Sequence, residues 1–470
     1  MSKRKIPVEK NQNYRAVVED YTHEGWGVAK IEGYPIFIEG AMEGEEVTFK
    51  VFKSGKSFAQ GRLTDIHQAS PDRVPIQDPV YAQTGTMDLA HMSYPAQLKF
   101  KQGQVENALR KIGNLTVVQV QETLGMESPY RYRNKAQVPV RADNQGHLVT
   151  GAFRKKSHDL IPIEDFLIQD PVIDQTIIQV RQTLEKYGIK AYDDRKNTGH
   201  IRHILVRRGH FTGDIMVVLV TRTPKLPHKQ EIVGDLEATV AQLVSVVQNI
   251  NPKKTNLVLG RKSQVLYRQD SYQDRVLNLE FNISHQSFFQ VNSKQTEALY
   301  RTAIDLADIQ AGDQIVDAYC GIGTLTLSLA KEADQVYGVE VVPQAVSDAI
   351  KNADLNQIKN VHFVQAKAEK WLVDQAKIGM HADLIFVDPP RKGLDSAFIE
   401  AAIQVRPRQI IYISCNPGTL ARDLNKFTEA NYQLSQVQPI DMFPQTHHVE
   451  TVVLLSLIHI SEPTRLGMIS

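Results

Sequence analysis

The C-terminal part of the chain alternates between strand-like and helix-like periodicity, and this alternation constrains the fold more than any other feature. It begins near Ile283. Short buried strands separated by helices are typical of a doubly wound parallel sheet, in which ligands bind at the carboxyl ends of the strands. The predicted strands are Gln314 to Cys320, Gln335 to Val342, Val361 to Gln365, Leu384 to Asp388, Gln409 to Ser414, Tyr432 to Met442 and Thr451 to Leu455.

One of these strands ends in a cysteine. The β-branched and aromatic run Ile410 to Ile413 predicts a buried strand, and Asn416-Pro417-Gly418 breaks it, so that Cys415 lies at the carboxyl end. A polarizable nucleophile at that edge is placed for chemistry. The alternative is a small buried packing residue, because free cysteine is among the most buried residue types.

A glycine-containing turn follows the first predicted strand. Asp317 to Thr324 contains Tyr319, Gly321 and Gly323, and glycines there let the backbone approach a ligand closely. Glu340 ends the next strand, where a carboxylate can accept two ribose hydroxyl groups. Together these features favour S-adenosylmethionine over a nucleotide phosphate. The alternative is a tight turn and an unrelated surface acid.

A motif at the end of the fourth strand limits which atom of a base can be methylated. It reads Asp388-Pro389-Pro390-Arg391-Lys392-Gly393. Amino-group methyltransferases carry an aromatic residue directly after such a Pro-Pro pair, and here Arg391 replaces it. RNA cytosine methyltransferases place a second cysteine after the proline of this motif, and this chain has none there. Carbon 5 of uracil is therefore the favoured target.

The N-terminal region has a different pattern. Short alternating segments separated by glycines run from Tyr14 to about Ile66, which predicts a small β-barrel. The run Gly25 to Lys30, with Ile36-Phe37-Ile38 and Gly44-Glu45, resembles the TRAM domain, an OB-like RNA-binding module. The alternative is a structural barrel without a ligand.

The middle of the chain is basic. Residues 125–270 carry 23 Lys or Arg against 15 Asp or Glu, whereas residues 281–470 carry 15 against 21. A basic face indicates a polyanionic partner, and a solvated surface is the alternative. Within it, Arg131, Tyr132, Arg133 and Lys135 interleave cations with an aromatic ring, a mixture that suits RNA. With Arg391 they are the candidate RNA contacts.

Five ordered motifs together resemble the RNA uracil-5-methyltransferase family, which includes 23S rRNA and tRNA enzymes. The resemblance implies a class I (Rossmann-like) α/β methyltransferase domain, with Gln290, Tyr319, Gly321, Gly323, Glu340 and Asp388 binding the methyl donor, Cys415 as nucleophile and Glu450 as general base. The motifs are Ser287 to Asn292, Asp317 to Thr324, Asp388 to Gly393, Ser414 to Pro417 and His448 to Thr451.

The chemistry of uracil is consistent with these roles. Carbon 5 is a poor nucleophile until a thiolate adds at carbon 6, and a base must later remove the proton at carbon 5. Glu450 is suitably placed if its strand runs antiparallel beside the strand of Cys415. A structural acid at a strand edge is the alternative for Glu450.

Cysteine content separates this chain from many members of that family, which hold an iron–sulfur cluster. Only Cys320, expected to be a packing residue, and Cys415 are present, so a four-thiolate cluster is impossible. No metal site is expected. The composition, the lack of a long apolar run and the N-terminus without a signal peptide predict a cytoplasmic protein with no membrane contact.

These patterns predict five segments. They are a disordered N-terminus (1–12), a TRAM barrel (13–68), a β-rich middle RNA-binding domain (69–280) whose helix at 97–112 may be expected to pack on the catalytic domain, the class I domain (281–456) and a non-native tail (457–470). The expected activity is methylation of uridines in 23S rRNA by a monomer. A tRNA uracil-5-methyltransferase and a catalytically silent RNA-binding protein are the alternatives.

Overall fold

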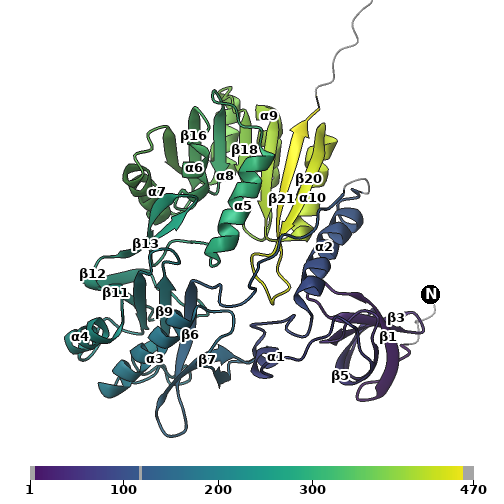
Figure 1. Cartoon of the computed structure of the whole chain (residues 1–470), viewed down its shortest axis with the longest axis vertical. Helices are drawn as coiled ribbons and strands as arrows, with labels where there is room; N and C mark the ends of the chain where they lie inside the picture. Colours follow the sequence, from purple (N-terminus) through teal and green to yellow (C-terminus); the bar gives the residue numbers. More distant parts are fainter. Residues whose placement is uncertain (1–5, 116–118, 459–470) are drawn as a thin grey trace, which may run out of the picture.

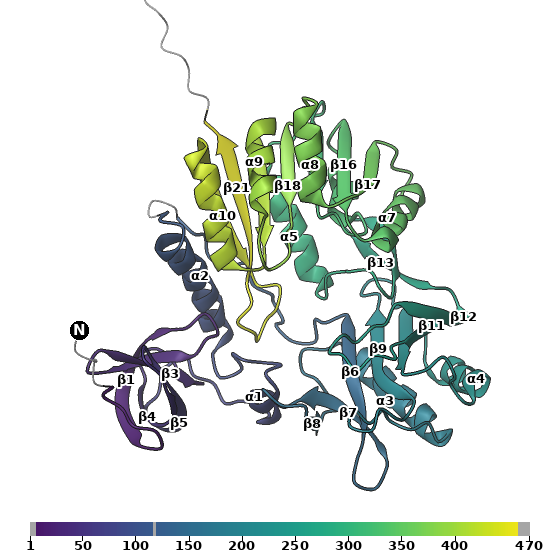
Figure 2. The same ribbon diagram turned by 180° about the vertical axis from the view of Figure 1, so that it is seen from behind.

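The computed structural model describes residues 6–115 and 119–458 and contains three bodies (Figures 1 and 2). A small barrel, a middle sheet and a larger C-terminal sheet surround the segments that connect them. Residues 1–5 of the predicted disordered N-terminus lie outside the description. Residues 6–12 were wrongly included in that prediction, because Val8 is buried in the barrel core and the Asn11 amide donates to the carbonyl of Val51.

The N-terminal body is the predicted barrel. Its five strands close in the order β1-β2-β3-β5-β4, and β3 pairs in parallel with β5. The interior is filled by alternate apolar side chains such as Ile36, Ile38 and Phe49, which follow the period-two pattern of the sequence. The strands are β1 (Asn13–Tyr21), β2 (Gly27–Ile31), β3 (Tyr34–Glu39), β4 (Glu46–Ser54) and β5 (Ala59–Gln68).

Two helices follow the barrel, α1 (Val80–Thr84) and α2 (Tyr94–Lys111). Ser93 caps α2, with its hydroxyl accepting from the amide of Ala96. The buried side of α2 packs on α10 (Pro417–Glu429), a helix of the C-terminal domain, and Val105 and Leu109 belong to the same apolar core as that domain. Helix α2 therefore lies beside elements more than 300 positions later in the chain (Figure 1).

The middle body is a seven-stranded sheet in the order β12-β11-β10-β9-β6-β7-β8. Its helices α3 (Pro171–Lys186) and α4 (Lys229–Thr239) cover one face. The strands are β6 (Lys135–Ala142), β7 (Leu148–Phe153), β8 (Leu160–Pro162), β9 (Ile201–Arg208), β10 (Ile215–Thr221), β11 (Leu243–Ile250) and β12 (Lys262–Arg268).

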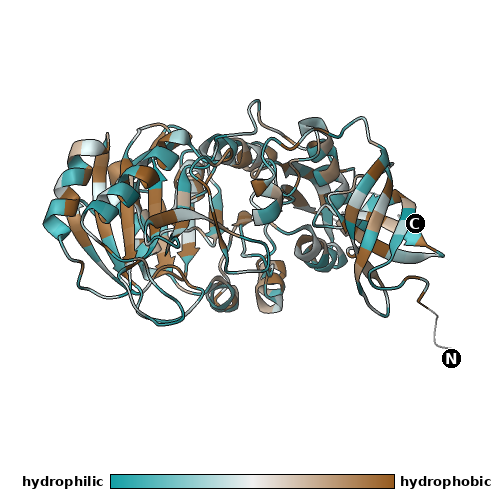
Figure 3. Cartoon of the chain, turned by 90° about the horizontal axis from the view of Figure 1, so that it is seen from below, coloured by the Kyte–Doolittle hydropathy of each residue, from teal (hydrophilic) through white to brown (hydrophobic). Residues whose placement is uncertain are grey.

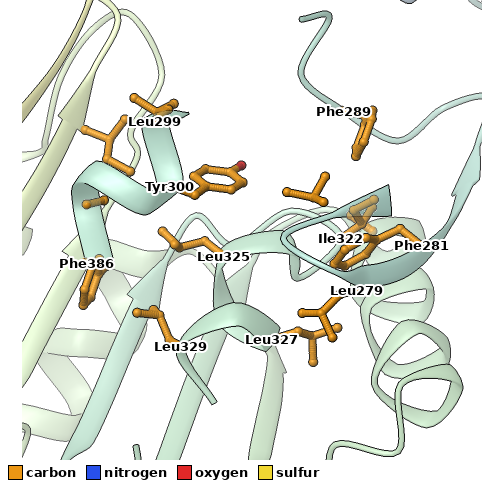
Figure 4. Packing of buried hydrophobic residues seen from close by; sticks show 14 of the residues in the cluster. Leu279, Phe281, Phe289, Leu299, Tyr300, Ile322, Leu325, Leu327, Leu329 and Phe386 are labelled. Atoms are coloured by element: carbon orange, nitrogen blue, oxygen red, sulfur yellow. The ribbon is translucent and has the colours of Figure 1, made fainter. Parts of the chain in front are cut away.

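A hairpin of β13 (Ser271–Val276) and β14 (Leu279–Ser284) joins the middle and C-terminal bodies. Leu279 and Phe281 pack beside Ile322 and Leu327 of the C-terminal domain (Figure 4). The expected boundary at residue 281 cuts through this hairpin, whose two strands pair along their whole length. The boundary at 281 is therefore misplaced, and we propose a boundary before Ser271.

The C-terminal body is the predicted doubly wound sheet, in the order β17-β16-β15-β18-β19-β21-β20. Five strands are parallel, and β21 runs antiparallel to both of its neighbours. This is the class I methyltransferase arrangement that the sequence predicted. The strands are β15 (Gln314–Ala318), β16 (Gln335–Glu340), β17 (Val361–Gln365), β18 (Leu384–Val387), β19 (Gln409–Ser414), β20 (Tyr432–Ile440) and β21 (Glu450–Leu457).

Helices cover both faces of this sheet (Figures 1 and 2). Besides α10 they are α5 (Ser293–Leu306), α6 (Thr324–Leu329), α7 (Pro343–Leu355), α8 (Ala368–Lys377) and α9 (Ser396–Val405). Strand β21 extends to Leu457, which pairs with Tyr432, so Leu457 is not part of a separate tail. Residues 459–470 of the predicted non-native tail lie outside the described residues.

Hydrophobic positions concentrate on the strands, whereas loops and outward helix faces are mainly hydrophilic (Figure 3). Leu205, Met216 and Val218 of the middle sheet share one apolar core with the C-terminal sheet. Because these strands bury a common core, the two bodies are fixed to each other by packing rather than by a linker alone. Within residues 6–115 and 119–458, no helix is long and apolar enough to cross a membrane.

Candidate active site

The predicted site residues gather at the carboxyl edge of the parallel strands of the C-terminal sheet. Strand β15 leads into the glycine turn, β16 ends at Glu340, β18 leads into Asp388 and β19 leads into Cys415. Strand β21 begins at Glu450 and runs antiparallel beside β19, with Thr451 opposite Ser414. The antiparallel arrangement that the role of Glu450 requires is therefore present, and it brings Glu450 to the end of the sheet where Cys415 lies.

The turn after β15 has the backbone conformation that a close ligand approach requires. Tyr319, Gly321 and Gly323 all have positive φ values, of 70°, 57° and 83°. A Cβ atom at Gly323 would lie 3.0 Å from the ring of Phe363, so glycine is needed there for packing as well as for φ. A Cβ atom at Gly321 would meet nothing within 4 Å, which leaves its backbone open to a ligand.

Glu340 is joined to this turn by its carboxylate. One oxygen accepts from the Gly321 amide at 3.2 Å and the other from the Val342 amide at 2.8 Å, which fixes the orientation of the side chain. Carboxylate oxygens accept more than one hydrogen bond each, so the group can still accept from ribose hydroxyls. The residues present therefore fit the ribose of an S-adenosyl donor.

Two further carboxyls lie below the turn in a desolvated environment. Burial raises the pKa of Asp388 to about 7 and that of Asp317 to about 7. Asp317 is nearly inaccessible, and it accepts from the Thr326 hydroxyl at 2.6 Å. Asp317 thus supports the start of α6. Asp388 has no hydrogen bond from a side chain among the described residues, which leaves its oxygens available to a ligand.

The segment before α5 carries Gln290. Its backbone is held by the middle domain, because the Asn134 side-chain amide donates to the Gln290 carbonyl at 3.0 Å and to the Ser293 hydroxyl at 2.9 Å. The Gln290 side chain is buried and makes no hydrogen bond among the described residues. Phe289 packs in the shared core (Figure 4), whereas the neighbouring Phe288 is 67% exposed.

Cys415 is half-buried at the entry to α10. The following residue, Asn416, caps that helix by accepting from the amides of Gly418 and Thr419. Desolvation raises the pKa of the Cys415 thiol to about 11, and the charges of Glu450 and Asp388 act in the same direction. The cysteine is therefore a thiol in the free protein at neutral pH, and the thiolate is the stronger nucleophile.

Glu450 is buried, with 4% of its surface exposed. Desolvation raises its pKa well above the usual range, and the neighbouring charge of Asp388 adds to the effect, while Arg391 opposes it. A buried carboxylate with a raised pKa is a stronger base than one in water. Cys415, Glu450, Asp388 and Arg391 thus form one electrostatically coupled group.

Arg391 and the two histidines line the outer side of this group. The Arg391 guanidinium is exposed and lies 3.5 Å from Nε2 of His448. Desolvation and neighbouring cations lower the pKa of His448 to about 4, so this ring is neutral at physiological pH. His447 instead contacts the carboxylate of Asp88, at 3.0 Å. A contact of Arg391 with RNA remains a prediction.

A loop between β20 and β21, residues 441–449, leads directly into Glu450 and is held by residues that the sequence analysis missed. Lys101 and Asp441 form an ion pair in which both side chains are fully buried. The Tyr94 hydroxyl donates to Asp441 at 2.9 Å. The Gln97 side-chain amide donates to Oε1 of Gln445, and the Gln97 side-chain oxygen accepts from the backbone amide of Gln445. The loop is visible below the sheet, beside α2 (Figure 1).

One sequence signal could have identified this contact. Gln97, Lys101, Val105 and Leu109 follow each other at intervals of four and share one face of α2, and all four are buried. A lysine among the apolar positions of a helix face requires a buried acid as partner. The identity of that acid has no local signal, because Asp441 lies 340 positions away.

A cleft of about 1210 Å³ opens from this group between the catalytic domain and the barrel. Cys415, Arg391 and His448 line its inner end, α2 forms a wall, and Tyr21 and Glu43 of the barrel line its outer end. A cleft of this size accommodates a flipped nucleotide together with its neighbours. Its barrel side carries the acidic residues Asp20, Glu24, Glu43 and Asp72.

The predicted RNA contacts in the middle domain divide into two sets. Tyr132 is 6% exposed, and its hydroxyl donates to the Pro444 carbonyl at 3.0 Å, so its ring is not available to stack on a base. Arg131 is paired with Asp165 and with Asp174. The prediction is therefore wrong for Tyr132, and Arg131 has a structural role. Arg133 and Lys135 are half-buried and have no acidic partner among the described residues.

Comparisons with known proteins agree with this geometry. Residues 93–458 match the tRNA (uracil-5-)-methyltransferase family model, and residues 7–64 match the TRAM domain. The chain is 48% identical over 451 residues to an "uncharacterized RNA methyltransferase" of Enterococcus faecalis, covering 96% of this chain and 98% of the relative. A relative with the same description from Lactiplantibacillus plantarum is 49% identical over 451 residues, with the same coverage.

Among solved structures, a tRNA (uracil-54, C5)-methyltransferase of Pyrococcus abyssi in complex with S-adenosyl-L-homocysteine is similar over almost the whole chain. The TM-score is 0.75 and the sequence identity 25%, and the match covers 94% of this chain and 99% of that one. The similarity therefore extends to the barrel and the middle sheet as well as to the catalytic domain.

Proposed function

The chain belongs to the tRNA (uracil-5-)-methyltransferase family, and from this membership we propose that it methylates carbon 5 of specific uridines in 23S rRNA. It is an S-adenosylmethionine-dependent RNA methyltransferase rather than a silent RNA-binding protein. The observation that supports the mechanism most directly is the meeting of Cys415 and Glu450 at adjoining ends of two antiparallel strands.

In the proposed reaction, Cys415 acts first. Its thiol loses a proton to solvent in the cleft, and the sulfur adds to carbon 6 of uracil, so that the electrons of the carbon 5–carbon 6 double bond form an enolate. Carbon 5 then takes the methyl group from the sulfonium of the donor, whose carbon–sulfur bond breaks to leave S-adenosylhomocysteine. The product of this step is a covalent RNA–protein adduct.

Glu450 completes the reaction as general base. Its carboxylate removes the proton from carbon 5, the carbon 5–carbon 6 double bond forms again, and the bond between carbon 6 and the Cys415 sulfur breaks. The buried position of Glu450 supports this role, because desolvation increases the basicity of the carboxylate. The same burial keeps water away from the adduct.

The donor contacts form a separate part of the proposal. Glu340 accepts from the ribose, Gly321 and Gly323 let the donor approach the turn, and Asp388 and Gln290 supply buried polar groups next to the reaction center. Tyr319 follows β15 within the same turn. The conformation of the turn and the bond between Glu340 and Gly321 support this assignment.

The choice of RNA rests on the basic middle domain, which suits a large, irregular RNA. The barrel does not distinguish the candidates, because the Pyrococcus abyssi protein whose structure matches 94% of this chain is a tRNA enzyme. That match specifically favors tRNA as the second candidate substrate.

The protein is further proposed to work as a monomer in the cytoplasm without an iron–sulfur cluster. Two cysteines cannot supply four thiolate ligands. A cytoplasmic location follows from the proposed RNA substrate.

The experiment that tests this function is mass-spectrometric mapping of 5-methyluridine in total RNA from cells with and without the gene. We expect 5-methyluridine to disappear from one or more positions of 23S rRNA and to return with the wild-type protein but not with Cys415→Ala. Loss confined to tRNA would replace the ribosomal assignment with the second candidate. No loss in either RNA would contradict uracil methylation.

A further inference from the structure

Three cations converge on one face of the middle sheet, next to the segment that carries Phe288 and Gln290. Lys135 of β6 lies directly opposite Arg207 of β9 in the antiparallel ladder, and side chains at such paired positions share a face. Arg133 forms an isolated bridge with Gln169 just before β6 begins, and it lies close enough for its charge to act on Lys135. Like charges placed directly opposite are destabilising, and such an arrangement needs a compensating anion.

The structure provides no acid for this cluster. Lys135 and Arg133 make no ion pair within residues 6–115 and 119–458, and the only polar side chain beside Arg133 in that range is the neutral Tyr132 hydroxyl. Arg207 is 4% exposed; it donates to the carbonyls of His285 and Ser287, and its Nε has no partner. Asp170, whose amide donates to the Arg133 carbonyl, is already paired with Arg208 at 2.6 Å and caps α3.

The electrostatics of Lys135 are consistent with a missing anion. Desolvation, together with the charges of Arg207 and Arg133, lowers its pKa to about 8. A bound anion would reverse these effects, because an opposite charge favors the charged form of the lysine. The three cations therefore form an arrangement that is unfavorable in the free protein and favorable when an anion binds.

The position of the cluster, beside segments of the active site, indicates that its anionic ligand is RNA. The two residues that flank Arg133 contact the active-site segments. Tyr132 donates to the Pro444 carbonyl of the loop 441–449, and Asn134 donates to the Gln290 carbonyl before α5. The exposed ring of Phe288 lies one residue from the Arg207-bound carbonyl of Ser287 and is open to stacking by an unpaired base. A phosphate beside an open aromatic ring is the pattern of a bound nucleotide.

We propose that Arg133, Lys135 and Arg207 form a binding site for a backbone phosphate of the RNA strand that enters the active site. This inference rests on the proposed function, since it assumes that RNA is the substrate. Lys135 and Arg133 contact the phosphate, and the buried Arg207 holds the 285–287 segment and adds its positive charge. The site fixes the position of the strand without recognising its sequence.

The test compares Lys135→Gln with the control Lys370→Gln in the full-length protein. Lys370 is an exposed lysine of α8 outside the cluster. Binding of a uridine-rich single-stranded oligoribonucleotide is measured over a range of salt concentrations. We expect Lys135→Gln to weaken binding about ten-fold and to reduce the slope of log affinity against log salt by about 0.7, the value for one phosphate of a single strand. Lys370→Gln should change neither, and Lys135→Arg should restore the slope.

Three further measurements separate this proposal from its alternatives. Lys135→Gln should keep or raise the urea midpoint, because it removes repulsion from Arg207; a clear loss of stability would indicate a structural lysine and overturn the proposal. S-adenosylhomocysteine binding by calorimetry should be unchanged; a loss there with an unchanged salt slope would mean that the cluster binds the donor carboxylate. Formation of 5-methyluridine by the wild-type protein is measured in a separate assay. Absence of this product would contradict the proposed function, whereas an unchanged salt slope in Lys135→Gln would contradict the phosphate site.

Discussion

At the scale of single residues, Cys415 and Glu450 share one desolvated environment but have opposite requirements. The cysteine must lose a proton before it can add to uracil, and the glutamate must be ionised to accept one later. Burial raises the pKa of both groups. It makes the thiol a poor nucleophile in the free protein and the carboxylate a strong base in the adduct.

The first prediction concerns the adduct itself. Glu450→Gln should still allow addition and methylation, but the proton at carbon 5 should remain and the covalent protein–RNA adduct should accumulate. Cys415→Ala should abolish transfer, with donor binding unchanged. The measurement is denaturing electrophoresis with a substrate RNA and labelled donor. An adduct band that survives in the Cys415→Ala, Glu450→Gln double variant would mean that another residue is the nucleophile.

The second prediction concerns pH. Because the pKa of Cys415 is raised to about 11, the thiolate fraction should rise about ten-fold per pH unit from pH 7 to pH 10. Alkylation by iodoacetamide, followed in a Cys320→Ala variant with a single thiol, should follow the same slope without a plateau. Cys415→Ala in that background is the control. A levelling of the rate above about pH 9 would show an ordinary thiol, with a pKa of about 8.5, and would contradict the effect of burial.

At the scale of elements, α2 and the loop 441–449 behave as one unit. Met442 and Val449 anchor the loop in the apolar cores, and its polar residues are held by the buried ion pair of Lys101 with Asp441 and by the two hydrogen bonds between Gln97 and Gln445. Burial lowers the pKa of Lys101, and the charge of Asp441 opposes that effect. The orientation of Glu450 at the end of the loop therefore depends on a helix from another part of the chain.

The third prediction follows from this ion pair. Lys101→Met should lower the free energy of unfolding by about 3–5 kcal/mol, because Asp441 is left buried without its cation. Lys99→Met, on the exposed side of the same helix, should change it by less than about 0.5 kcal/mol. Urea denaturation of both variants checks this. Equal effects would mean that the pair contributes nothing beyond ordinary packing.

At the scale of the whole molecule, the catalytic domain is not an independent unit. The middle sheet contributes Leu205, Met216 and Val218 to its core, and α2 contributes Val105 and Leu109. Burial of each such side chain stabilises the fold by about 1.5–3 kcal/mol. Together these contributions are comparable to the whole stability of a domain.

The fourth prediction is that a fragment of residues 281–456 will not fold alone. It lacks β13, the apolar partners in the middle sheet and Lys101, so it should show no cooperative thermal unfolding and no binding of S-adenosylhomocysteine. Circular dichroism and calorimetry provide the measurements, with the full chain as control. A stable, donor-binding fragment of this size would contradict the dependence on α2 and the middle sheet.

The sequence by itself determined the features that arise from local patterns. The strand periodicity placed Cys415 at the end of β19 and the glycine turn after β15. The antiparallel pairing of β21 with β19 was only a condition for the role of Glu450, and the structure supplied it. The barrel and the doubly wound sheet were also predicted from local sequence patterns. These predictions succeeded because side-chain period and backbone-breaking residues act within a few positions of each other.

Only the tertiary structure decided which polar residues are structural. Tyr132 was predicted to contact RNA, but the loop at Pro444 covers it, and the burial of Lys101 is explained only by Asp441 beside it. Val8 and the hairpin across residue 281 were misjudged for the same reason. Each depends on a partner from a different part of the fold, and the free energy of burying a polar group is set by that partner rather than by the local sequence.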